Sequence, residues 1–129
     1  MTATIERAGT MDADNKARVL TEATLRAAEI LGISNKELAG ILGVSPSFVS
    51  KLKSRASALD MNSKQAELAA HFVRAFRSLD AIVGGDEATA QSWLRNENTA
   101  LEAVPIDRLQ RIDGLLDVVA YLDQRRAPI

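Results

Sequence analysis

Residues 35–54, NKELAGILGVSPSFVSKLKS, constrain the fold of this chain more than any other segment. Gly43 separates two short apolar-periodic stretches and is suited to a turn that needs positive φ. Ala39, four positions earlier, is small enough for two crossing helices to approach each other. Val49, six positions after the glycine, is an apolar residue for the inner face of the second helix. This spacing predicts a helix-turn-helix.

The outer face of the second predicted helix carries short hydroxyl groups and positive charge. Taken alone, such a face is more typical of an ordinary solvated helix than of a binding surface. Joined to the helix-turn-helix spacing, it predicts contact with base edges and phosphates in a DNA major groove. The predicted DNA-binding residues are Ser45, Ser47, Ser50, Lys51 and Ser54, with Lys53 and Arg55 acting on the DNA backbone.

The net charge of -1 suggests no affinity for nucleic acid, but the charges are unevenly distributed. Residues 33–59 have a balance of +3, and residues 61–129 a balance of -2. The excess of positive charge therefore coincides with the predicted recognition helix. Because affinity scales with the number of phosphates neutralised, one copy should bind DNA weakly. We therefore expect a homodimer or a larger assembly on double-stranded DNA.

The composition predicts an all-α protein. The 129 residues include 21 Ala and 15 Leu, against 8 Val and 8 Ile, and this balance favours helices over strands. We expect a disordered lead-in over 1–14, a DNA-binding domain over 15–60, a connecting or dimerisation helix over 61–83, and a further domain over 84–129. The absence of cysteine, of a long apolar run and of a signal pattern predicts a cytoplasmic protein without disulfides.

Two apolar stripes indicate where helices of the second half pack. Phe72, Phe76 and Leu79 could form either a core face or a dimer seam, and core is the simpler interpretation. We expect the last helix to bury one apolar stripe, formed by Leu109, Ile112, Leu116, Val119 and Leu122.

The motifs of the two halves resemble two known families. Residues 33–55 are similar to the helix-turn-helix of Xre-type, phage-repressor-like transcription factors. Residues 84–124 resemble the C-terminal toxin-binding domain of Xre/MbcA/ParS antitoxins, through Ala90, Trp93, Leu94, Asn98, Leu101, Pro105, Leu109, Gly114, Val118 and Leu122. The family usually has a glycine between that Leu and the Pro. This chain has none, and we expect the turn there to be more helical.

The resemblance implies a type II antitoxin. Such a protein would neutralise a RES-domain, NAD⁺-consuming toxin and would repress its own operon by binding operator DNA. The family's C-terminal end covers the toxin's active site, so the implied toxin-binding residues are Leu122, Arg125, Arg126, Pro128 and Ile129. For Arg125 and Arg126, a favourable interaction with the helix dipole is an equally good explanation.

Catalytic, metal and cofactor sites are not expected. The carboxylates are scattered among basic residues, as on solvated helix faces, and no Gly-rich phosphate loop or nucleophile–base pattern is present. The single histidine, His71, has no second metal ligand at a suitable spacing. The alternative to the antitoxin is a stand-alone Xre-type repressor whose C-terminal half only dimerises.

Overall fold

The computed structural model describes the backbone of residues 2–126 and the side chains of residues 12–126. The helices are α1 (Thr2–Ile30), α2 (Asn35–Leu42), α3 (Pro46–Lys53), α4 (Lys64–Ile82), α5 (Glu87–Arg95), α6 (Pro105–Leu109) and α7 (Ile112–Arg126). Within residues 2–126, the only β pairing is an isolated bridge between Asn98 and Ala103. The predicted all-α class is confirmed. No helix in this range is both long enough and apolar enough to span a membrane.

Side-chain caps mark the start of several helices. Ser34 accepts a hydrogen bond from the Glu37 amide, and the Glu37 carboxylate accepts one from the Ser34 amide, which makes a complete capping box for α2. Ser63 caps α4 and Asp86 caps α5. Such caps satisfy amides that have no partner within the helix, and they fix where each helix begins.

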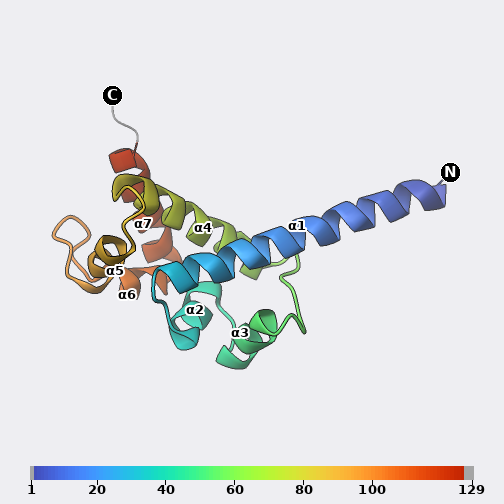
Figure 1. Cartoon of the computed structure of the whole chain (residues 1–129), viewed down its shortest axis with the longest axis horizontal. Helices are drawn as coiled ribbons and strands as arrows, with labels where there is room; N and C mark the ends of the chain where they lie inside the picture. The colour runs from blue at the N-terminus through green and yellow to red at the C-terminus, as the bar shows by residue number, and fades with distance from the viewer. Residues whose placement is uncertain (1, 127–129) are drawn as a thin grey trace.

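The first helix differs from the prediction. The lead-in expected over residues 1–14 is helical from Thr2, and α1 continues without a break to Ile30. Residues 2–14 contain no proline and several good helix formers, so they extend a helix that is already nucleated further along. Figure 1 shows this part of α1 projecting away from the other helices, and residues 12–16 are all exposed.

Helix α4 lies in the middle of the molecule, packed against α1 on one side and α7 on the other (Figure 1). Phe72 is fully buried and Leu79 is 2% exposed, while Phe76 is partly buried against them. The stripe on α4 is therefore a core face, as the simpler interpretation held. One continuous core runs from Ala27 in α1 to Leu122 in α7, so both halves of the chain share it.

Helix α7 is rotated relative to the prediction. Leu115, Val118, Val119 and Leu122 face the core, whereas Ile112 and Leu116 are 63% and 45% exposed. The cause lies at the junction of α6 and α7, where a Cβ atom on Gly114 would lie 2.1 Å from the Arg108 carbonyl oxygen. The Gly114 face must therefore turn inward, and that orientation places Ile112 and Leu116 on the outside.

Candidate functional site

Helix α3 is anchored through one face and presents the other. Val49 is fully buried and Leu52 is 1% exposed, so both pack against the preceding helices. Ser45 caps the helix by accepting a hydrogen bond from the Phe48 amide at 3.1 Å. Gly43 forms the turn with φ of 70°. These features are those of a helix-turn-helix with α3 as the second, recognition helix.

All seven predicted DNA-binding residues are exposed, but some of their polar groups already have partners within the chain. The Ser50 hydroxyl donates to the Pro46 carbonyl oxygen at 3.3 Å, and the Ser54 hydroxyl donates to that of Lys51 at 3.1 Å. The Ser45 and Ser47 hydroxyl oxygens lie 3.2 Å apart. Lys51 projects from the exposed face of α3, in the middle of the predicted set.

The two basic residues at the end of α3 are held by contacts that the sequence pattern did not predict. The Lys53 ammonium donates to the Asn35 side-chain oxygen at the start of α2. Arg55 has a left-handed backbone, with φ of 65°, and its guanidinium lies 3.8 Å from the Glu22 carboxylate. Since both of these charged side chains are more than half exposed, the ion pair contributes little energy. It does offset part of the local positive charge.

A hollow of about 590 Å³ lies beside the end of α3, between α1 and residues 52–58. Helix α1 adds Arg18 and Arg26 to this region, together with Glu22 and Glu29. Segment charges counted along the sequence could not find these arginines, because α1 reaches α3 only through the tertiary fold. Since two arginines come with two glutamates, α1 adds charged groups near the recognition helix without adding net positive charge.

The C-terminal prediction requires one correction. Leu122 was predicted to contact the toxin, but it is 2% exposed and packs in the core. Arg125 is exposed, and its guanidinium carbon lies 5.5 Å from the centre of the Tyr121 ring. Tyr121 in turn stacks on Trp93, with ring centres 6.3 Å apart. Pro128 and Ile129 lie outside the residues that the structure describes.

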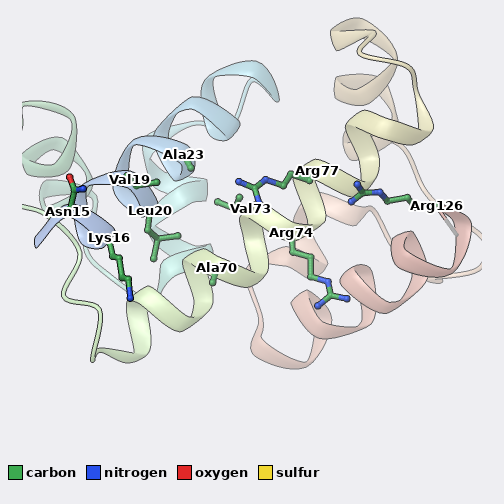
Figure 2. Close-up of a pocket in the computed structure, with 10 residues that line it drawn as sticks. All are labelled: Asn15, Lys16, Val19, Leu20, Ala23, Ala70, Val73, Arg74, Arg77 and Arg126. Atoms are coloured by element: carbon green, nitrogen blue, oxygen red, sulfur yellow. The ribbon is translucent and has the colours of Figure 1, made fainter. Parts of the chain in front are cut away.

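Arg126 lies at an open groove of about 580 Å³ that runs between α1 and α4 (Figure 2). Within the described part of the chain, every charged residue that lines this groove is basic: Lys16, Arg74, Arg77 and Arg126. Arg74 is paired with Asp123, which also accepts a hydrogen bond from the Ser78 hydroxyl at 2.8 Å. Burial acts to raise the pKa of Asp123, but the bonds from Ser78 and Arg74 outweigh it and lower that pKa.

Helix α5 is joined to the helix-turn-helix by a set of polar contacts. Arg95 forms a two-pronged ion pair with Glu37 and also donates to the Gly32 carbonyl oxygen at 2.8 Å. Gln91 donates to the Ile30 carbonyl oxygen at 2.8 Å. The hydrogen bonds from Arg95 lower the pKa of Glu37 to about 2, despite partial burial. The carbonyl groups at the end of α1 are thereby satisfied from the C-terminal half.

Comparison with known families matches the N-terminal and C-terminal parts of the chain to two different domains. Residues 11–74 match the antitoxin Xre-like helix-turn-helix domain, and residues 78–127 match the antitoxin Xre/MbcA/ParS C-terminal toxin-binding domain. The chain belongs to the Xre/MbcA/ParS antitoxin family. It combines the DNA-binding and toxin-binding domains of these antitoxins. A comparison with curated proteins gave no match.

The antitoxin departs from its family in the turn before α6, and the structure corrects what we expected there. The turn is not more helical, because Glu102 has a left-handed backbone with φ of 55°. The neighbouring Asn98 and Ala103 form the isolated bridge, and the Asn98 side-chain oxygen accepts from the Leu101 amide at 3.0 Å. Here the antitoxin uses a glutamate in a conformation that favours glycine.

Proposed function

We propose that this antitoxin neutralises a RES-domain, NAD⁺-consuming toxin and represses its own operon by binding operator DNA. The observation that carries the proposal is that one chain pairs an Xre-like helix-turn-helix with an Xre/MbcA/ParS toxin-binding domain. Both activities depend on occupancy and not on chemistry. We place them in the cytoplasm, where operator DNA is accessible.

The DNA-binding part of the proposal relies on the exposed face of α3. Ser47 and Lys51 would contact base edges and phosphates, while Lys53 and Arg55 would contact the backbone. The net charge of residues 33–59 is only +3, so one copy should bind DNA weakly. We therefore expect two copies on one operator, with their recognition helices about 34–36 Å apart. A homodimer, or a hetero-oligomer with the toxin, would supply the two copies.

The toxin-binding part relies on the C-terminal domain and the tail. The guanidinium groups of Arg125 and Arg126 are exposed at the end of α7, while Leu122 anchors that end in the core. The end of α7 is thereby fixed to the core, and we propose that the C-terminal residues cover the toxin's active site. Arg125 and Arg126 would approach acidic groups of the toxin, since guanidinium pairs favourably with carboxylate.

Co-expression with the product of the neighbouring gene, which we propose to be a RES-domain toxin, tests the proposal. We expect cells that make both proteins to grow and to retain NAD⁺, whereas cells that make the toxin alone should lose it. If the toxin remains fully active beside the antitoxin while operator binding persists, the protein is a stand-alone repressor.

The contribution of the tail is tested separately. Deleting residues 127–129 and changing Arg125→Ala and Arg126→Ala leaves the Asp123 contacts with α4 in place. Weaker neutralisation by this variant supports active-site coverage by the tail. Unchanged neutralisation excludes it, without affecting the assignment of the protein as an antitoxin.

A further inference from the structure

We propose that Ile112 and Leu116 form a stripe on α7 that docks into an apolar groove of the toxin, as an anchor distinct from the C-terminal tail. The inference rests on the proposed function, and it names which surface of the toxin-binding domain makes the contact. Ala120 continues the stripe by one more turn and is also exposed. We call these three residues the α7 stripe.

The α7 stripe stands out among the exposed apolar side chains of residues 12–126. Five large ones are exposed in this range: Val19, Met61, Ile82, Ile112 and Leu116. Ile112 and Leu116 are separated by four positions on one helix, so they lie side by side on its surface. The core already takes Leu115, Val118, Val119 and Leu122 from the adjoining arc of α7. The two outward apolar residues are therefore not needed to pack this helix.

The surroundings of the α7 stripe hold it rigidly. Gly114 packs directly against the Arg108 carbonyl oxygen, which locks α7 onto α6. The Arg108 guanidinium pairs with Asp117, and Arg111 donates to the Asp113 carboxylate at 3.4 Å. The apolar stripe is thus bordered by ion pairs on a preformed helix, and a surface of this kind loses little conformational freedom when it binds.

The location of the α7 stripe points to the toxin as its occupant. It lies within residues 78–127, which match a toxin-binding domain. Apolar residues at i and i+4 are the pattern by which a helix anchors in a partner's groove. Two large side chains and an alanine are far short of the roughly 800 Å² per partner that a stable interface buries. The stripe therefore acts as the apolar centre of a wider contact and not as a self-sufficient dimer seam.

Two charge-introducing variants with matched controls test this inference. Ile112→Asp places an acid in the first turn of α7, where the helix dipole favours it, so the fold should persist. Leu116→Lys introduces a good helix former. Met61→Asp and Met61→Lys are the controls, since the Met61 side chain is 40% exposed, against 63% and 45% for Ile112 and Leu116, and lies away from the groove that Arg126 lines. Affinity for the purified RES-domain toxin that we propose as the partner is measured by titration calorimetry, with thermal melting as the check on folding.

We expect each stripe variant to weaken toxin binding by about tenfold or more, and each control to bind like the wild type. If the stripe variants bind the toxin as tightly as the wild type does, the inference is wrong and the proposed function stands. If the wild type does not bind the toxin, both are wrong. A stripe variant that alters self-association in sedimentation but leaves toxin binding intact would make the stripe a contact between copies of this chain, which also overturns the inference.

Discussion

At the residue scale, α3 separates side chains that pack from side chains that reach outward. Ala39, Gly43 and Val49 could be assigned from sequence because each fills a steric requirement of the helix-turn-helix, and all three do so in the structure. The contacts of Lys53 with Asn35 and of Arg55 with Glu22 could not be assigned. They join residues far apart in the chain, and no local pattern records them.

Lys51→Ala should weaken operator binding and flatten its salt dependence. The side chain is exposed on the recognition helix, and losing one phosphate contact removes about 0.9 from the slope of log K against log salt. Lys64→Ala is the control, because Lys64 lies at the start of α4, outside α2 and α3, and pairs with Glu67. Fluorescence anisotropy with labelled operator at several salt concentrations gives both slopes. Equal slopes for the two variants would remove Lys51 from the interface.

Glu102→Gly should raise the free energy of unfolding by about 0.5–1 kcal/mol, because a left-handed backbone is costly for a side-chain-bearing residue and costs glycine nothing. Glu97→Gly, also exposed and just before the same turn, should leave stability unchanged or lower it, since glycine adds freedom to the unfolded chain. Urea denaturation compares the two. A loss of stability in Glu102→Gly would show that its side chain has a compensating role.

At the scale of the elements, helix positions follow from the sequence better than helix rotations do. Capping residues such as Ser34 and Asp86 identify where helices begin, because each cap is a local interaction. The rotation of α7 could not be read from its apolar residues, which occupy too wide an arc to define one buried face. It depends on Gly114 meeting the Arg108 backbone, a contact between two helices.

Gly114→Ala should destabilise the protein by about 2 kcal/mol or more, because its Cβ would meet backbone atoms that cannot move aside. Gly40→Ala is the matched change on α2. There the nearest atoms to the Cβ would belong to the flexible Gln110 side chain and not to backbone, and alanine favours the helix. Thermal unfolding should show a large loss for the first variant and little loss or a gain for the second. Equal effects would contradict the proposed role of Gly114 in orienting α7.

Arg95→Met should lower stability by about 1 kcal/mol at neutral pH, because it breaks the ion pair between α5 and α2, and exposure of the arginine limits the loss. The pKa of Glu37 is about 2 in the folded protein, below its ordinary value of 4.5. The stabilisation is therefore full above pH 4.5 and is lost as the pH falls from 4.5 toward 2. Urea melts across this range should fall less steeply for Arg95→Met than for the wild type. Parallel curves would exclude a stabilising Glu37–Arg95 pair.

At the scale of the whole molecule, the DNA-binding and toxin-binding parts share one core. Helix α4 contributes Phe72 and Leu79 to it, and α5 joins the helix-turn-helix through Arg95 and Gln91. The sequence indicates the two parts through separate motifs and predicts a helix between them, but it does not show that they share one core. The first turns of α1 were also missed, since a polar segment without an apolar period gives no signal for a projecting helix.

The central claim is that this protein inhibits a toxin by binding it. The most direct measurement is the rate of NAD⁺ consumption by the purified RES-domain toxin that we propose as the partner, while wild-type antitoxin is titrated in. The account predicts that the rate falls to background once the antitoxin reaches a fixed stoichiometric ratio. A rate that stays constant through an excess of folded, operator-binding antitoxin would contradict it.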